Sequence, residues 1–492
     1  MLYLLSIKLS GIKRSRSGEV KALLADNKII AKLRPFFDGR LFPVVLGAVL
    51  FLCYALRLPL TALILLVLSF VFICLFSEDT RPGLAVLLLG FLSLRYKYDL
   101  PAYLSIWAII VYSVGGALVA AAAIYRLAIT ERISHKRTVW ITLALLGAAF
   151  LLGGVGSRYY ELRSFLVAIG NAALLLVIYF FFSYTIKPRE DNLVYLARIC
   201  AVAICVIALQ LAELYLRSFQ TGMRLDGVWK EEGLILGWGI SNLVGEMLVT
   251  LLPAVFYLIY KEKRGYWYYF VVAIACVATY FTLARGALLC GAAVVLAGII
   301  VNCLFGKNKW VNVGMASTLF LGLIGALVYL QISQKGRDIF AFFVEAGFSD
   351  RGRFELWEAC VGLWRESPIF GVSFSAYRHL ELQKETLYTA HNTIIQMLSG
   401  TGIVGLTAYL LHRAHTVWLL FKKPSLDRFF MAGCIVAALA VSLVGPLFFR
   451  TYFLIFYAVF LTVLEKSLET DTRKTGKKTQ KHKNGRNGRI KL

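Results

Sequence analysis

Apolar residues occur along the chain in long runs, separated by short segments that carry most of the Lys and Arg. A helix needs about 20 apolar residues to cross the hydrocarbon core of a bilayer. Lipid offers no partners to backbone polar groups, so each spanning run should be helical. The pattern therefore predicts an all-α, polytopic helical membrane bundle. Fourteen runs are candidate spans: 41–58, 60–77, 83–95, 102–125, 138–156, 164–186, 193–216, 241–260, 267–284, 286–304, 312–332, 391–411, 430–446 and 448–465. Twelve spans are the alternative if the shortest run, 83–95, is re-entrant.

Composition narrows the class of protein. Of the 492 residues, 59% are hydrophobic and 16% are charged, whereas soluble domains carry about 25% charged residues. A soluble enzyme, a disordered chain and a classical DNA-binding domain are excluded. The formal net charge of +25 is explained by the concentration of cationic residues in cytoplasmic loops, so no nucleic-acid partner is expected.

The distribution of positive charge predicts the orientation. If the N-terminus is cytoplasmic and the spans alternate, the inner segments hold roughly twice as many Lys and Arg as the outer ones, as the positive-inside rule requires. Both termini should therefore be cytoplasmic. The predicted organisation is a basic N-terminal segment 1–40, spans 1–11 over 41–332, a long extracytoplasmic loop 333–390, spans 12–14 over 391–465, and a basic disordered tail 466–492.

Positive residues on the predicted outer side are mostly Arg, whereas the inner segments favour Lys. The planar guanidinium group binds phosphate through two parallel hydrogen bonds, which an ammonium group cannot do. The outer face is therefore a candidate anion-binding surface. Ordinary ion pairing with acidic residues of the same loops is the alternative.

The long outer loop contains a stretch, 353–364, with helical spacing of apolar residues. Its predicted apolar face consists of Phe354, Trp357, Val361 and Trp364. Such a helix either lies along the membrane surface or packs on the bundle as a lid. Arg353 and Glu355 stand on its polar edge.

Three titratable residues have unusual positions. His391 stands where an apolar run begins, and an imidazole there can take a proton from a sugar hydroxyl near neutral pH. Arg285 occupies a short turn between two apolar runs. Glu246 lies near the outer end of a span, one turn after Asn242. Ionisable residues at such depths are candidates for function. Capping, packing and pairing between helices are the alternatives.

The segment Gly400–Gly405 matches the dinucleotide-binding fingerprint G-x-G-x-x-G. That fingerprint requires a preceding strand in a βαβ unit, whereas this segment lies inside a predicted membrane helix. Close helix packing through small residues is the better interpretation. No Walker loop, HExxH or paired metal-binding Asp motif occurs, so neither a cofactor nor a metal is expected.

Several motifs, taken in order, resemble the signature of the O-antigen ligase and O-antigen polymerase-like family. The segments are Trp238–Pro253 with Asn242, Ala284–Ala287, Gly352–Trp357, Ser367–Ser373, His391–Asn392 and Gly402–Gly405. The resemblance covers roughly residues 235–410. The chain departs from the family pattern where Ser373 replaces a glycine and where Ala284 replaces a Ser or Thr.

The resemblance implies a glycosyltransferase at the outer face of the bacterial cytoplasmic membrane. The donor would be a glycan on a polyprenyl diphosphate such as undecaprenyl diphosphate. The acceptor would be a second lipid-linked glycan for a polymerase, or a lipid or cell-wall hydroxyl for a ligase. His391 would be the general base, and transfer would invert the anomeric centre without a metal. The candidate diphosphate-binding residues are Arg285, Arg353, Arg351 and Arg224, and the candidate supporting residues are Asn392, Glu246, Asn242 and Glu355.

A membrane carrier is the main rival: a flippase for lipid-linked glycans or a small-anion transporter that uses Glu246 and the outer arginines. Such carriers commonly show internal repeats and access from both faces. This chain has no convincing internal repeat, and its polar groups gather on one predicted face. The enzyme is therefore the preferred interpretation. The sequence leaves open the choice between polymerase and ligase, the sugars and the oligomeric state.

Overall fold

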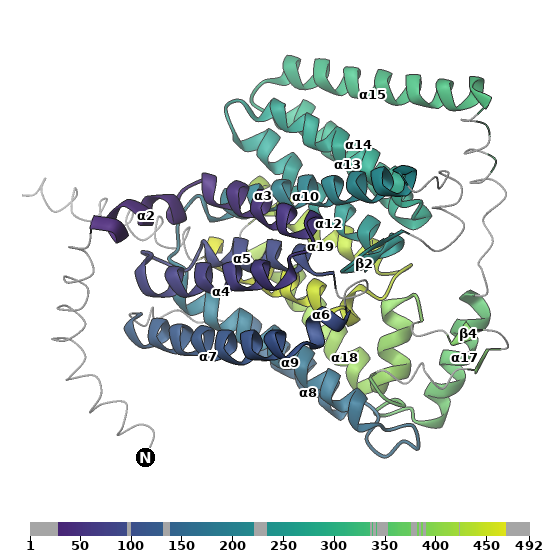
Figure 1. The fold of residues 1–492 in the computed structure, drawn as a ribbon. Helices are drawn as coiled ribbons and strands as arrows, with labels where there is room; N and C mark the ends of the chain where they lie inside the picture. Colours follow the sequence, from purple (N-terminus) through teal and green to yellow (C-terminus); the bar gives the residue numbers. More distant parts are fainter. Residues whose placement is uncertain are drawn as a thin grey trace, which may run out of the picture. The chain divides into compact units, whose positions relative to one another are not determined.

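The computed structural model of the chain is almost entirely helical (Figure 1), which confirms the predicted polytopic helical bundle. It describes residues 28–95, 100–130, 138–220, 234–334, 353–374, 390–422 and 424–468, with Arg337, Ala341, 381–382 and 385–386. The chain divides into two compact units. Unit 1 comprises Met1–Lys136, Phe180–Tyr195 and Lys466–Leu492, and unit 2 comprises Arg137–Tyr179 and Leu196–Glu465.

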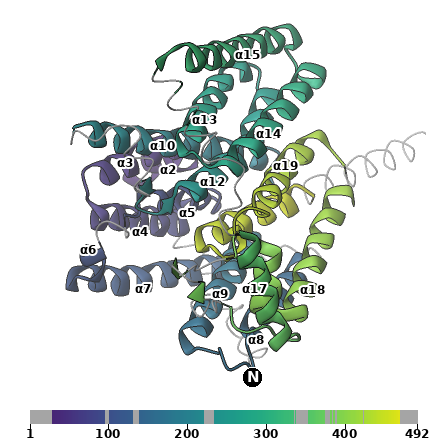
Figure 2. The same cartoon turned by 90° about the vertical axis from the view of Figure 1, so that its right-hand side faces the viewer.

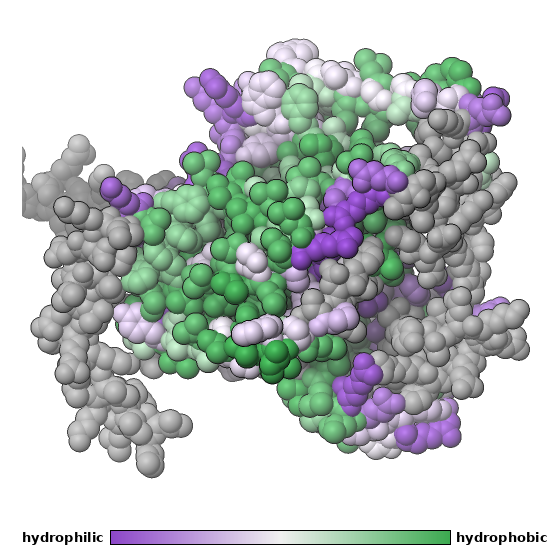
Figure 3. Space-filling view, in the orientation of Figure 1, coloured by the Kyte–Doolittle hydropathy of each residue, from purple (hydrophilic) through white to green (hydrophobic). Residues whose placement is uncertain are grey.

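Unit 1 is built from apolar helices whose outward faces expose large hydrophobic side chains. Its helices are α2 (Lys28–Asp38), α3 (Leu41–Ala55), α4 (Pro59–Phe76), α5 (Gly83–Gly90), the 3-10 turn η1 (Phe91–Ser93), α6 (Leu100–Leu104) and α7 (Ile106–Ile129). On α4 the side chain of Leu68 is 57% exposed, and on α7 that of Trp107 is 67% exposed. Figure 3 shows the apolar surface over α4. Such continuous apolar exposure is appropriate for helices that face lipid rather than water.

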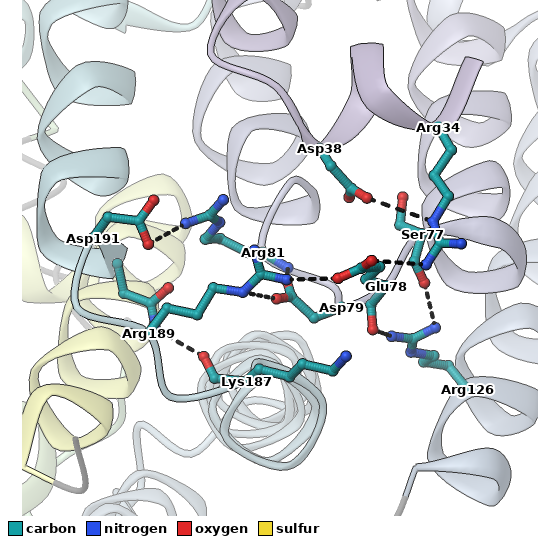
Figure 4. Close-up of polar contacts among 11 residues, drawn as sticks. Arg34, Asp38, Ser77, Glu78, Asp79, Arg81, Arg126, Lys187, Arg189 and Asp191 are labelled. Carbon is teal, nitrogen blue, oxygen red and sulfur yellow. Dashed lines mark hydrogen bonds and ion pairs between the residues drawn. The ribbon is translucent and has the colours of Figure 1, made fainter. Parts of the chain in front are cut away.

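Charged side chains of unit 1 meet in one cluster, drawn in Figure 4. The ion pairs include Arg34–Glu78 at 3.3 Å, Arg189–Asp79 at 3.0 Å and Arg81–Asp191 at 2.8 Å. Arg126 donates to the carbonyl oxygens of Ser77 at 2.9 Å and Glu78 at 2.8 Å. These residues come from four segments that the sequence assigns to the cytoplasmic side. These contacts therefore join four segments that lie far apart in the sequence.

Unit 2 contains the longer helices and the family motifs. Its elements are α8 (Val139–Leu152), most of α9 (Leu162–Thr185) and α10 (Asn192–Gln220), β1 (Ile235–Leu236), β2 (Gly239–Ile240), α12 (Ser241–Lys261), η2 (Gly265–Tyr268), α13 (Tyr269–Thr282), α14 (Arg285–Phe305), α15 (Lys309–Ile332), α17 (Arg353–Glu366), β3 (Glu381–Leu382), β4 (Glu385–Thr386), α18 (Thr393–Lys422), α19 (Leu426–Val441), η4 (Leu447–Phe449) and a last helix, Thr451–Leu468. Each strand pair is a short antiparallel hairpin.

The core of unit 2 is α12, in which every residue from Leu243 to Ile259 is buried. Helices α13, α14 and α19 pack around it. Small residues allow the close approach: a Cβ built on Gly433 of α19 would lie 3.0 Å from Pro253, and one on Gly291 of α14 would lie 3.1 Å from Val249. Such contacts stabilise helix pairs in lipid, where packing replaces the hydrophobic effect as the driving force.

The predicted number of fourteen spans is wrong. Among the described residues, ten helices are long and apolar enough to cross a membrane, or up to eleven if the bent pair Lys32–Asp38 and Leu41–Ala55 forms one span. Every predicted run is helical, but Gly83–Ser93 and Val139–Leu152 are shorter apolar helices, and α19 has only 16 residues. At 1.5 Å per residue such helices do not reach across a hydrocarbon core of about 30 Å. Apolar content predicted the helices correctly and their lengths incorrectly.

Candidate functional site

The candidate site surrounds the turn of residues 442–446, which follows α19. The N-terminus of α18 is fixed to this turn by three hydrogen bonds. Thr393 donates through its backbone N–H to the Ser442 carbonyl at 2.9 Å and through its hydroxyl to the Gly445 carbonyl at 3.3 Å. The Asn392 side chain donates to the Leu443 carbonyl at 3.1 Å. His391, directly before Asn392, is therefore held beside the turn.

His391 adopts a left-handed backbone conformation, with φ at 50°. Few residues other than glycine do so, and such strain persists only where the surroundings enforce it. Here Asn392 caps α18, because its Oδ1 accepts from the backbone N–H groups of Ile394 at 2.9 Å and Ile395 at 3.1 Å. On the other side Trp357 donates to the Ala390 carbonyl at 2.8 Å. The contacts on both sides thus hold the backbone at His391 in this conformation.

The imidazole of His391 is half-buried and lies close to two guanidinium groups. Burial, followed by the positive charges of Arg353 and Arg450, lowers the pKa of His391 to about 4. Both causes disfavour the protonated ring. At neutral pH the ring is uncharged and keeps a nitrogen that can accept a proton, which a general base requires.

Arg353 is positioned by α17, which packs against α18 (Figure 2). The predicted helix is confirmed over Arg353–Glu366. The side chains that it buries against the protein are not those of the predicted apolar face. Leu356, Cys360 and Leu363 form the buried face, whereas Phe354 is 66% exposed. The helix packs on α18, and the charge of its first residue, Arg353, acts on His391.

Glu246 approaches the same turn from α12. Its side chain is 2% exposed, and a Cβ on Gly445 would overlap its carboxyl group. Arg450 and Arg353 are the charged residues whose fields act on this carboxyl group. Among the described residues, neither Glu246 Oε2 nor Arg450 Nε has a hydrogen-bond partner. Arg353 and Arg450 therefore act on both the carboxyl group of Glu246 and the imidazole of His391.

Arg285 is the first residue of α14, and its neighbours contact the same structure. A Cβ on Gly286 would lie 2.6 Å from Cγ2 of Val444, in the 442–446 turn. A Cβ on Gly245, the residue before Glu246, would lie 2.8 Å from Ala287. The beginning of α14 is therefore wedged between α12 and the turn. Three predicted residues (His391, Arg285 and Glu246) thus belong to segments that converge on one turn.

The motif from Pro368 to Ser373 supports α18 where that helix is broken. Gly402 interrupts α18 with φ 65° and ψ −165°. The N–H groups of Ile403 and Val404 donate instead to the carbonyls of Pro368 at 3.0 Å and Ile369 at 3.2 Å. The segment Gly400–Gly405 therefore allows close packing, as the sequence suggested. Its partner is the turn at Pro368–Ile369 rather than another helix. Ser373, in place of the family's second glycine, is buried and bonds to the Ser164 hydroxyl.

Replacing Gly402 by alanine should lower the thermal stability of the protein in detergent. The left-handed backbone alone costs about 1–3 kcal/mol for a residue with a side chain, and the new Cβ would collide with the Ile369 carbonyl. Gly362→Ala is the matched control, because that glycine lies on the exposed side of α17 with nothing within 4 Å of its Cβ position. Equal melting temperatures for the two variants would contradict the proposed contact.

The remaining predicted residues have varied placements. Asn242 is half-buried in the first turn of α12. Glu355 is exposed in the first turn of α17. Arg351 and Arg224 lie outside the described residues. No group of three or more His, Cys, Asp or Glu side chains in the described part of the chain is arranged to hold a metal ion.

Arg450 is the site residue that the sequence analysis did not single out. It interrupts the apolar stretch Phe448-Phe449-Arg450-Thr451-Tyr452-Phe453. The same signal, an arginine between apolar residues, drew attention to Arg285. Applied consistently, that reasoning would have identified Arg450 as well.

Fold and site together define a multi-pass helical membrane protein with a neutral histidine near two half-buried arginines, which also act on a buried carboxyl group. Residues 247–410 match the family model of the O-antigen ligase domain, which confirms the resemblance seen in the sequence. The matched range includes Arg285, Arg353 and His391 but excludes Glu246 and Arg450. A search of curated proteins found no match. The domain supports a membrane glycosyltransferase-like role in polysaccharide assembly.

Proposed function

We propose that the protein transfers a glycan from a polyprenyl-diphosphate-linked donor to an acceptor hydroxyl at the outer face of the bacterial cytoplasmic membrane. The acceptor is a second lipid-linked glycan or a lipid, as in a surface-polysaccharide polymerase or an O-antigen ligase. The observation that carries the proposal is the neutral imidazole of His391, held in a strained backbone beside Arg353 inside the matched domain.

The reaction assigns one task to each group. His391 takes the proton of the acceptor hydroxyl as the acceptor oxygen attacks the anomeric carbon. The bond from this carbon to the diphosphate oxygen breaks, and the electron pair leaves with the diphosphate. Arg285 and Arg353 stabilise the charge that develops there, since fixed cations act most strongly where charge appears in the transition state. Direct attack from the opposite side inverts the anomeric centre, and no step routes through a metal ion.

Two observations support the proposed orientation. Cationic residues are enriched in the segments assigned to the cytoplasm, and four of these segments in unit 1 meet in the cluster of Figure 4. Both termini are then cytoplasmic, and the 333–390 loop, with α17 and the site, faces outward. That side is where a glycan on a polyprenyl carrier meets its acceptor.

The purified full-length protein, incubated with lipid-linked repeat units and no other acceptor, should convert them into a ladder of longer glycans if it is a polymerase. If it is a ligase, the donor should remain until a lipid or cell-wall acceptor is added, and one glycan should then move to that acceptor. The products are separated by gel electrophoresis, with His391→Ala as the inactive control. Unchanged donor under both conditions would contradict the proposed enzyme and favour a carrier.

A further inference from the structure

The loop between α8 and α9, residues 153–161, contacts the family motif Ser367–Ser373, although the loop lies outside the matched range 247–410. The N–H of Gly154 donates to the Phe370 carbonyl at 2.8 Å. Gly154 has φ at 87°, and a Cβ there would lie 2.7 Å from Cα of Ser373. Glycine adopts this conformation without strain and leaves the room that the approach requires. The backbone of the loop is therefore fitted closely to the turn that follows α17.

An apolar cluster beneath α17 joins this loop to the start of α18. The loop contributes Tyr159, whose ring is half-buried. Aromatic rings bury large apolar areas and commonly dominate such contacts. The cluster therefore holds α17 from below, with one side formed by the loop. Its buried members are Leu356, Cys360, Leu363, Val372 and Ala390, and the partly buried residues packed against them include Tyr159 and Ile395.

An ion pair joins the same loop to the last residue of α17. Arg158 Nη2 lies 2.8 Å from Glu366 Oε2 and donates to the Tyr159 hydroxyl at 2.7 Å. The side chains of Arg158 and Glu366 are 71% and 43% exposed, and exposed ion pairs contribute little to stability. The packing of the Tyr159 ring should therefore hold α17 more strongly than this ion pair does.

The first turn of α17 faces the candidate site. Trp357 donates through Nε1 to the carbonyl of Ala390 at 2.8 Å, directly before His391. Arg353 precedes Trp357 by four residues, and residues at this spacing lie on the same face of a helix. A tilt of α17 would therefore move the guanidinium group of Arg353 relative to the imidazole of His391.

We propose that Tyr159 is a positioning residue for glycosyl transfer, because its ring holds α17 at the tilt at which Arg353 and His391 serve one site. The inference rests on the proposed function in taking Arg353 to hold the diphosphate of the donor. Tyr159 acts through Arg353 rather than on the substrate. The activity thus depends on a loop outside the matched domain.

Tyr159→Ala should lower the rate of transfer at saturating donor about 10-fold or more, because a misplacement of about 1 Å can cost about 10²-fold. Tyr159→Phe should restore most of the rate, since it keeps the ring and loses only the hydroxyl. Tyr160→Ala is the matched control and should transfer like the wild type. This neighbouring tyrosine is 41% exposed, and its ring contacts Phe165 of α9. Wild-type turnover in Tyr159→Ala would overturn the proposal.

A double-mutant cycle with Arg353→Gln separates positioning from a merely structural role. Residues that act through one another have non-additive effects. Once Arg353 is absent, Tyr159→Ala should therefore change the remaining rate by less than about 2-fold. A residue that only stabilises the protein would lower the rate by the same factor in both backgrounds. That additive result would assign Tyr159 to structure and overturn its role in positioning.

Hydrogen exchange of the full-length protein in detergent, followed by mass spectrometry, tests the contact without any transfer. Amide hydrogens of α17 should exchange faster in Tyr159→Ala than in the wild type, whereas those of the buried helix α12 should not change. If α17 loosens but the wild type transfers no glycan, the proposed function fails and Tyr159 remains the residue that holds α17. If the wild type transfers glycan while exchange in α17 is unchanged by Tyr159→Ala, the enzyme stands and the positioning role fails.

Discussion

His391→Ala should reduce glycosyl transfer by about 10²- to 10⁴-fold, the usual contribution of a positioned general base. Donor binding should remain nearly intact, because the imidazole acts on the acceptor hydroxyl rather than on the diphosphate. The measurement is the initial rate of transfer with purified donor, together with donor affinity determined in parallel. A large loss of rate at unchanged affinity is the result that a base requires.

The matched control is His379→Ala. His379 falls in the same long loop of the sequence but in no family motif, so its removal should leave the rate unchanged. Full turnover in His391→Ala would exclude His391 as the base. A loss of donor binding in step with the rate would instead assign the residue to recognition or packing.

The pH dependence of the rate gives a second measure of the same group. The base must be neutral, and the pKa of His391 is lowered to about 4 by burial, Arg353 and Arg450. The rate at low donor concentration, which reports on the free enzyme, should therefore stay constant well below pH 6.5 and fall as the pH approaches 4. Arg450→Gln removes one cause of the shift and should move this fall to higher pH.

Arg285→Lys and Arg353→Lys should each lower the rate of transfer by about 10²-fold, the effect of removing one preorganised group that stabilises transition-state charge. Lysine keeps the charge but cannot offer two parallel hydrogen bonds to diphosphate oxygens. The rate constants of both variants are measured at saturating donor. Arg365→Lys, in the same helix as Arg353 but exposed, is the control. Wild-type turnover in both site variants would reduce these arginines to a general electrostatic role.

Much of the fold followed from apolar runs alone, because lipid permits only internally hydrogen-bonded helices. The same pattern did not show which face of α17 packs on the protein, where Leu356 and Cys360 are buried and Phe354 is exposed. Apolar spacing predicts that a helix face avoids water. Near a membrane, such a face can be covered either by lipid or by protein. Only packing against α18 decided which face turned inward.

The candidate site, too, followed partly from the sequence and partly only from the tertiary structure. The order of motifs selected His391, Arg285 and Arg353, since each is unusual within its own segment. Their association required the 442–446 turn, to which α18 is bonded and on which the start of α14 packs. No local pattern predicts that turn as a meeting point, although an arginine between apolar residues marks Arg450 as it marks Arg285.

The sequence by itself determined the class of protein, the positions of its helices and the candidate residues for the chemistry. These properties depend on hydrophobicity and side-chain type, which act locally along the chain. Tertiary structure alone decided how many helices are long enough to span, why Gly402 breaks α18 and which charges surround Glu246. These properties depend on contacts between segments far apart in the chain, because the energy of a buried charge or a strained backbone is set by the neighbours that the fold brings to it.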